Sequence, residues 1–233
     1  FPYTTLFRSQ LVRLNAHVTG HRFLRGAVVP GGVRTQALPD ATVVRQLAHD
    51  VAEVVDLALG HSVVRDRFTG TAVLTAAQAH ELGCLGYVGR ASGVDVDARR
   101  THPFHPATVD VARTTATSGD VLARFRTRAE EVQASAELVT RLLDGAPVGS
   151  QIAHRPSGAE GGPRSGVGLV EGWRGTIVHR VELADDGTLT RVKVVDPSFL
   201  TWPAVPVALA DTIVPDFPLT NKSFNLSYAG NDL

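Results

Sequence analysis

The chain has 233 residues, 43% of them hydrophobic, which is enough to bury a sizeable core in one large or two small domains. Its 23 Lys and Arg balance its 23 Asp and Glu, and this formal net charge of +0 excludes a nucleic-acid binder driven by bulk charge and an acidic, disordered chain. The chain has one cysteine, Cys84, which excludes an internal disulfide or a multi-cysteine metal site within the chain. No apolar run approaches the roughly 20 residues that span a membrane, and no signal segment is recognisable. These features favour a soluble, intracellular protein.

The beginning of the chain carries few signals of regular structure. Residues 1–9 show neither a helical period nor strand alternation, and we interpret them as disordered, or as a cloning or read-through artefact fused to a chain that begins near Gln10. Residues 15–34 are punctuated by glycines and Pro30, which predicts an ordered but loop-rich stretch.

Two helices are predicted in the first third of the chain. Over 41–60 the apolar residues recur on one face, behind Asp40 as N-cap and up to Gly60 as terminator. A shorter helix is predicted over 75–83, with Thr75 as its cap.

The longest predicted helix lies in the middle of the chain. It is preceded by 84–106, which is rich in glycine, proline and polar residues and is predicted to be irregular. The helix covers 119–144, starts with Asp120 and ends at Gly145. Its apolar face consists of Val121, Leu122, Phe125, Val132, Leu138, Val139 and Leu142.

Strands are predicted only in the last third. After a glycine-rich loop over 157–168, residues 176–183 and 189–195 alternate as strands around the turn Asp185–Gly187, which predicts a hairpin. The proline-rich residues 197–218 are predicted to be extended. The expected fold class is α+β and mainly helical, with long helices packed against a small antiparallel β-hairpin.

Isolated residues with reactive side chains carry weak signals. His17 and His21 have the spacing of two ligands on one helix face, but a glycine between them argues against a helix. Prolines place His102 and His105 in a loop. Cys84 lies in apolar company, and we interpret it as a packed core residue. We therefore expect none of these residues to bind a metal.

Arg174 gives a stronger signal because it stands beside glycine at the entry to a predicted strand. Two interpretations stay open. The side chain is exposed, with its aliphatic stem on the surface, or it is buried and directs its five donors at an anion or a polar ligand.

Sequence blocks in a fixed order resemble a known family. They resemble the large subunit shared by energy-converting, group 4 nickel–iron hydrogenases of the formate-hydrogenlyase type and the 49-kDa (D) subunit of respiratory complex I. The likeness covers residues 10–233 and concerns the C-terminal part of that subunit. It implies one hydrogenase large-subunit-like domain over 10–233. The blocks are TGHRFLRGAVVPGGV, TAAQAHELGCLGYVGRASGVDVDARRTHPF, SGDVLARFRTRAEEVQAS, VEGWRG, RVKVVDPSFLTWPAV and VPDFPLTNKSFNLSYAGNDL.

The resemblance implies that this chain has no complete metal site. Hydrogenases of the family hold nickel and iron with two C-x-x-C pairs, because thiolates suit these metals. The first pair belongs to a segment upstream of this sequence. The second pair falls at the positions of Ser227 and Gly230, which supply no thiolate.

The resemblance also implies a set of site residues. Glu171 and Arg174 map to a block that faces the vestigial metal cavity, although Gly172 and Trp173 depart from the commoner E-A-P-R-G. Gly20, His21 and Arg22 match a segment at a subunit interface. The further cavity or quinone-side candidates are His179, Asp196 and Ser198.

The expected function is that of a membrane-associated, NADH-quinone oxidoreductase-like subunit without a cofactor of its own. It shapes a quinone or vestigial metal cavity while electrons pass from NADH or another donor to quinone. The implied partners are an iron–sulfur small subunit resembling the B subunit of complex I, a protein resembling its C subunit and membrane-arm subunits, with no nucleic acid. The implied location is cytoplasmic, on the inner face of the cell membrane. Two alternatives stay open, a catalytic nickel–iron hydrogenase subunit and a non-catalytic scaffold.

Overall fold

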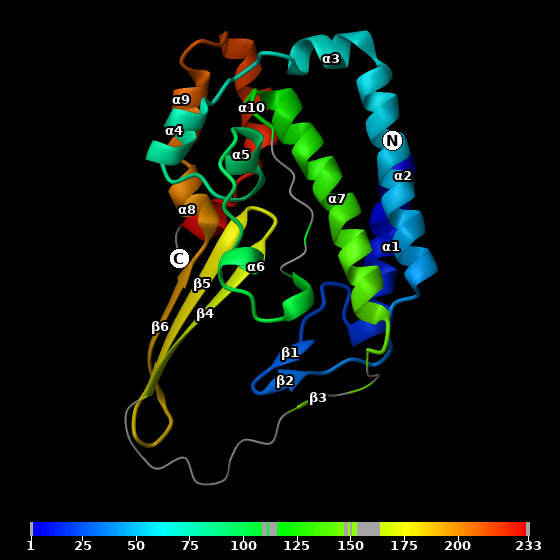
Figure 1. Ribbon diagram of the computed structural model, residues 1–233, viewed down its shortest axis with the longest axis vertical. Coiled ribbons are helices and arrows are strands. Elements are labelled where there is room, and N and C mark those ends of the chain that lie inside the picture. Colours follow the sequence, from blue (N-terminus) through cyan, green and yellow to red (C-terminus); the bar gives the residue numbers. More distant parts are fainter. Residues whose placement is uncertain are drawn as a thin grey trace. The chain divides into compact units, whose positions relative to one another are not determined.

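The computed structural model describes residues 2–108, 111, 116–146, 149, 151–152 and 164–231. Two units are distinguished along the chain. Unit 1 comprises Phe1–Val54 with Val132–Glu160, and unit 2 comprises Val55–Glu131 with Gly161–Leu233. Figure 1 colours the elements along the sequence.

Unit 1 begins with helix α1, Pro2–Thr19. Residues 2–9, which show no periodic pattern, form its first part, because a helix once nucleated adds a hydrogen bond for each further residue. The prediction of a loop from residue 15 is wrong for the first residues of that stretch, since α1 ends only at Thr19. Gly20 follows with a φ of 80° and donates its N–H to the carbonyl of Ala16, so glycine ends the helix.

The remainder of unit 1 is a small sheet with parts of two helices. Strands β1 (Val28–Val29), β2 (Gly32–Val33) and β3 (Gln151–Ile152) pair in that order and antiparallel. Helix α2, Ala41–Gly60, begins at the predicted cap, where Asp40 Oδ1 accepts a 2.7 Å hydrogen bond from the N–H of Thr42.

Unit 2 contains helices that the sequence predicts and helices that it does not. Helix α4 begins with the predicted Thr75, which forms a capping box, and α7 begins where Asp120 Oδ1 accepts from the N–H of Ala123 at 2.7 Å. The helices of this part are α3 (Ser62–Phe68), α4 (Ala76–Glu81), α5 (Gly86–Ala91), α6 (Ala98–Thr101), η1 (Pro106–Thr108) and α7 (Val121–Leu143).

The prediction that 84–106 is irregular is wrong for α5 and α6. Every residue of α5 is buried, so tertiary packing offsets the low helix propensity of its two glycines. Helix α6 is capped by Asp97, whose carboxylate accepts the N–H of Arg99 at 2.9 Å.

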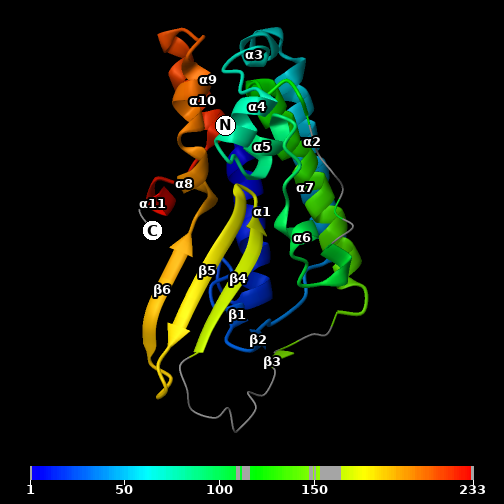
Figure 2. The same cartoon turned by 60° about the vertical axis from the view of Figure 1, so that its left-hand side comes forward.

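The second sheet has one strand more than the predicted hairpin. Strands β5 (Gly175–Leu183) and β6 (Leu189–Val195) lie where the sequence predicts them, and β4 (Arg164–Gly172) pairs antiparallel with β5 along its whole length. The described end of the predicted loop 157–168 is therefore strand, while 157–163 lies outside the described residues. Figure 2 shows β5 between β4 and β6.

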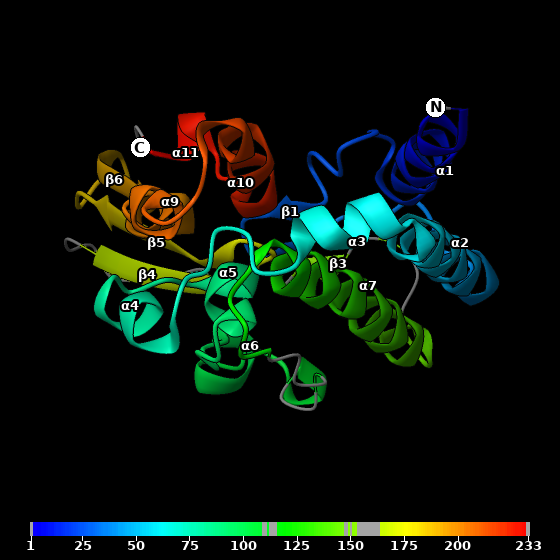
Figure 3. The ribbon, with the colours of Figure 1, turned by 90° about the horizontal axis from the view of Figure 1, so that it is seen from above.

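The C-terminal region is helical, so the prediction of an extended tail is wrong. Proline occupies an early position of α8 and of α10, where its missing N–H has no partner to lose. Helix α9 packs on α10, and Figure 3 shows the two helices beside each other. The elements are α8 (Pro197–Thr201), α9 (Ala204–Leu209), η2 (Val214–Asp216), α10 (Phe217–Phe224) and α11 (Tyr228–Asn231).

The core of unit 2 joins α4, α5 and the start of α7 to the C-terminal helices. Tyr87, Leu74 and Phe224 are its large members, each fully buried. Cys84 lies among them, as predicted, and burial raises the pKa of its thiol to about 11. None of the described helices is long and apolar enough to cross a membrane.

The helices, together with two small antiparallel sheets, confirm the predicted α+β, mainly helical fold class.

Candidate functional site

Trp173 and Arg174 form a two-residue turn between β4 and β5, where Gly172 pairs with Gly175. Arg174 is half-buried, and its Nε donates a 2.6 Å hydrogen bond to the carbonyl of Asn225. Burial lowers the pKa of the Arg174 guanidinium, Tyr87 and Asp196 oppose the shift, and Arg128 adds to it. The structure therefore lies between the two interpretations of Arg174 that the sequence leaves open.

The indole of Trp173 belongs to a group of stacked side chains. The rings of Tyr87 and Trp173 are nearly parallel, at 5° and with centroids 5.4 Å apart. The guanidinium carbon of Arg128 lies 5.0 Å from the Trp173 ring centroid, and that of Arg174 lies 4.1 Å from it. These distances are those of cation–π contacts.

Tyr87 has a structural role in this group. Its hydroxyl donates to the backbone carbonyls of Ser223 and Phe224. Burial raises its pKa to about 12, although three nearby arginines act in the opposite direction. The phenol is therefore protonated near neutral pH and is already engaged, which leaves it unsuited to acid–base catalysis there.

Asp196 and Ser198 meet Ser227 and Gly230 where β6 passes into α8. Asp196 Oδ1 accepts the N–H of Ser198 at 2.8 Å, and the buried Oγ of Ser198 accepts the N–H of Ser227 at 3.0 Å. Ser227 Oγ in turn accepts the N–H of Gly230 at 2.9 Å, at the start of α11. These bonds fasten α11 to the N-terminal end of α8.

The same residues do not fit a nickel–iron centre. Ser227 is used as a helix cap, and a Cβ placed on Gly230 would lie 2.5 Å from a carboxylate oxygen of Asp196, so this packing has no room for a side chain there. Cys84 is a buried thiol in the apolar core. No group of three His, Cys, Asp or Glu suited to holding a metal occurs among the described residues.

Glu171 belongs to a second, separate cluster. Its side chain is 3% exposed and accepts from Arg90 Nη1 at 3.1 Å and from the Ala98 N–H and Thr176 hydroxyl, both at 3.0 Å. Arg90 also binds Glu131, with Nε and Oε1 2.5 Å apart. Burial acts to lower the pKa of Arg90, but hydrogen bonds and attraction from Glu131 and Glu171 hold it above its ordinary value. The hydrogen bonds that Glu171 accepts thus hold α5, α6 and β5 together.

The other sequence-predicted residues lie apart from these clusters. His179 is exposed in the middle of β5, opposite Gly168 and Val194. Gly20, His21 and Arg22 form the turn after α1 in unit 1, where His21 Nδ1 accepts the N–H of Phe23 at 3.1 Å. The structure therefore brings Asp196 and Ser198 together, and the charge of Asp196 acts to raise the pKa of Arg174. Glu171 and His179 do not belong to this group.

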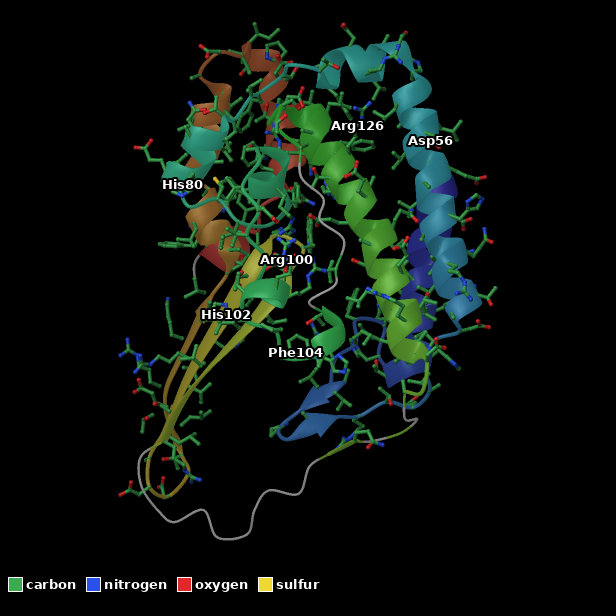
Figure 4. The ribbon with its side chains drawn as sticks, viewed as in Figure 1. Asp56, His80, Arg100, His102, Phe104 and Arg126 are labelled. Atoms are coloured by element: carbon green, nitrogen blue, oxygen red, sulfur yellow. The ribbon has the colours of Figure 1, made fainter. Side chains whose placement is uncertain are left out.

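The two histidine pairs lie in different units of the chain. His17 lies in α1 and His21 beyond its end, so the two are not on one helix face. His102 follows α6 in the loop that also holds Phe104 (Figure 4), and His102 Nδ1 lies 3.0 Å from the hydroxyl of Thr101.

Sequence reasoning singled out Arg174 but missed Arg90, Arg124 and Arg128. One face of α7 carries Arg124, Arg128 and Glu131 at the spacing i, i+4, i+7. Charged residues at a period that is typical of a buried apolar face are a signal that the sequence offered. Tyr87 and Arg90 lie in the stretch predicted to be irregular, and Trp173 stood out only as a departure from the family pattern. No local pattern indicated that these residues meet.

The turn at Trp173 and Arg174 depends on a close backbone approach at Gly86. Gly86 has a φ of 62°, and a Cβ there would collide with the carbonyl group of Arg174. Gly86→Ala is expected to lower the free energy of unfolding by about 2–4 kcal/mol, from the left-handed backbone and the overlap together. Urea unfolding of the full chain, followed by tryptophan fluorescence, measures this loss because Trp173 and Trp202 both lie in unit 2.

Gly83→Ala is the matched control for Gly86→Ala. Gly83 has a similar φ of 66°, but a Cβ there has no atom within 4 Å. Its loss is expected to be about 1–2 kcal/mol, the cost of the backbone conformation alone. Equal losses for the two variants would contradict the close approach.

Three comparisons relate the chain to known proteins. The profile of the family described as "Respiratory-chain NADH dehydrogenase, 49 Kd subunit" matches residues 1–165. The D subunit of F(420)H(2) dehydrogenase from Methanosarcina mazei is 32% identical over 93% of this chain and 61% of its own length. Formate hydrogenlyase subunit 5 of Escherichia coli is 28% identical over 97% of this chain and 40% of its own length. The chain thus spans less than two thirds of each relative.

A solved structure shares the fold. A chain of the membrane-bound sulfane sulfur reductase, an archaeal respiratory membrane complex, has a TM-score of 0.85 with 24% sequence identity. The similarity covers 100% of this chain and 66% of that one. This likeness shows that the chain shares the fold of that subunit.

Proposed function

Because the chain belongs to the family of the 49-kDa subunit of respiratory-chain NADH dehydrogenase, we propose that it is part of the large subunit of a membrane-associated, complex-I-like oxidoreductase. In this proposal the complete protein shapes a cavity that receives a quinone, and electrons reach the quinone from NADH or another donor. The names of relatives support this proposal, since they include NADH-quinone oxidoreductase subunits and the M. mazei dehydrogenase subunit.

The observation that carries the proposal is the packing at Ser227 and Gly230. Ser227 is a helix cap and Gly230 is packed against Asp196. In this proposal, which follows the family resemblance, these two residues correspond to the second thiolate pair of the hydrogenases. A large subunit without these thiolates needs a redox partner, and we propose an iron–sulfur small subunit for that role. A protein resembling the C subunit of complex I and membrane-arm subunits would complete a complex held at the inner face of the membrane.

The residues of this chain would contribute shape and hydrogen bonds rather than redox chemistry. Asp196 and Ser198 would border the cavity and hold α8 and α11 in place, through the bonds described above. Arg174 would stand at the edge of this cavity, held by the bond of its Nε to the carbonyl of Asn225. Glu171 would act as a positioning residue through Arg90, and Gly20, His21 and Arg22 would lie at a subunit interface.

A second function, that of a catalytic nickel–iron hydrogenase subunit, is favoured only by the similarity to formate hydrogenlyase subunit 5. It requires thiolates that residues 227 and 230 do not supply. A scaffold without a quinone site is the non-catalytic alternative.

Metal content and quinone reduction of the full-length protein, purified with its small-subunit partner, separate these functions. We expect iron from the partner's cluster, no nickel, and quinone reduction by the assembled complex. Near-stoichiometric nickel would restore the hydrogenase function, and an intact complex that never reduces quinone would favour the scaffold.

A further inference from the structure

Positive charge gathers around the Tyr87–Trp173 stack although the chain as a whole is neutral. Three positive charges act to lower the pKa of the Tyr87 phenol, those of Arg124, Arg128 and Arg174. Arg124 is fully buried and donates to Gly119, Ala72 and Ser223, so its donors are used. Arg128 and Arg174 are different, because each is only half-buried.

Neither of these two arginines forms an ion pair among the described residues, although the charge of Asp196 acts on Arg174. The ion pairs of this part of the chain involve other arginines, such as Arg90, Arg99 and Arg180. Arg174 uses Nε on the carbonyl of Asn225, and its terminal nitrogens have no acceptor in the described chain. Arg128 has no hydrogen bond there and contacts the ring faces of Tyr87 and Trp173.

Trp173 completes the arrangement with an apolar surface. Trp173 is 42% exposed although it follows Gly172 in a tight turn and stacks on a buried tyrosine. Stacking holds the indole in one orientation, so little conformational entropy is lost when a partner covers it. Tryptophan and arginine are the residues most often found where binding energy concentrates in a protein interface.

We propose that Arg128, Trp173 and Arg174 form the receptor for an acidic side chain of the iron–sulfur partner subunit. The existence of that partner rests on the proposed function. Two guanidinium groups that form no ion pair within the described part of the chain match the planar geometry of an Asp or Glu side chain. The indole excludes water from the contact, which strengthens each charge-assisted hydrogen bond. A partner protein covers the exposed indole and the charge together, whereas a free anion would cover only the charge.

The affinity of the full-length large subunit for its small-subunit partner tests the proposal. Arg128→Gln is expected to raise the dissociation constant at least about tenfold, and to make binding less sensitive to salt. Arg126→Gln is the matched control, because Arg126 is exposed on the same helix (Figure 4). This substitution removes the same charge as Arg128→Gln. Its dissociation constant is expected to stay within about twofold of the parent value.

Fluorescence locates the contact. The signal of Trp173 is the difference in acrylamide quenching between the full-length parent and its Trp173→Phe variant, each measured with and without the partner. Binding of the partner is expected to shield Trp173 from acrylamide, and succinate alone is expected to give no such protection. Equal protection by succinate would identify a site for small carboxylates and overturn the proposal.

Failure of the inference and failure of the proposed function give different results. A complex that forms with equal affinity in the parent and in Arg128→Gln would overturn the inference alone. A full-length protein that binds no iron–sulfur partner would overturn the proposed function, and the inference with it. Urea unfolding of Arg128→Gln, expected to match that of Arg126→Gln, excludes misfolding as the cause of a weakened complex.

Discussion

Replacing Arg90 with alanine is expected to lower the free energy of unfolding by about 3–5 kcal/mol. Arg90 is 3% exposed and holds Glu131 and Glu171 through separate nitrogens, 2.5 and 3.1 Å from their carboxylate oxygens. Its Nη1 also donates to the carbonyl of Val96 at 3.0 Å. Alanine would leave the buried charge of Glu171 without its cation, and this uncompensated charge accounts for most of the loss.

Two further variants show whether burial causes this effect. Arg180→Ala breaks an exposed pair with Glu182, with nitrogen and oxygen 2.8 Å apart, and is expected to cost less than about 1 kcal/mol. The double variant Arg90→Met with Glu171→Gln is expected to lose less than the sum of its single variants, because both buried charges disappear together. Urea unfolding with tryptophan fluorescence measures each of these chains. Equal losses for Arg90→Ala and Arg180→Ala would mean that water reaches the Arg90 cluster.

Elements with strong local signals could be predicted from the sequence. Helices α2 and α7 have apolar residues at helical spacing, and both begin at an aspartate that the structure shows as the cap. Strands β5 and β6 alternate around a turn that contains Gly187 at a φ of 83°. In these segments the local propensity and the final packing agree, so a short window of sequence is sufficient.

Elements that depend on distant partners could not be predicted. Strand β4 contains Gly166, Gly168 and Gly172, which weaken its own strand propensity, and its hydrogen bonds come from β5. The short helices after Pro197 contain prolines that look like breaks in a linear sequence but stand in first turns of helices.

The candidate site shows the same division. The family resemblance pointed to Asp196, Ser198, Ser227 and Gly230, which the structure brings into contact. The resemblance also assigned Glu171 and Arg174 to the lining of one cavity. In the structure, however, Glu171 lies in β4, where it faces Arg90, and Arg174 lies in the turn, where it faces Asn225. The two residues are close in sequence, and only the hairpin geometry decides where each side chain goes.

Replacing Arg124 with leucine is expected to lower the free energy of unfolding by about 4 kcal/mol, as for the loss of a hydrogen-bonded buried charge. The guanidinium is fully buried, and burial lowers its pKa to about 10, so it remains charged near neutral pH. Its nitrogens donate to the carbonyls of Gly119 and Ala72 and to the hydroxyl of Ser223, at 2.7, 2.9 and 2.9 Å. Leucine would remove all three bonds; the carbonyl of Gly119 would keep the N–H of Leu74, but Ala72 and Ser223 would lose this donor inside the core.

Lysine at the same position separates the charge of Arg124 from its shape. Arg124→Lys keeps the cation but loses the planar fork and the stacking on Phe224, where the guanidinium carbon lies 4.4 Å from the ring centroid. Its loss is expected to be about half that of Arg124→Leu. Arg126→Leu, exposed on the same helix, is expected to change stability by less than about 0.5 kcal/mol. If Arg124→Lys were as stable as the parent chain, positive charge alone would be what this part of the core requires, and the directed hydrogen bonds would be dispensable.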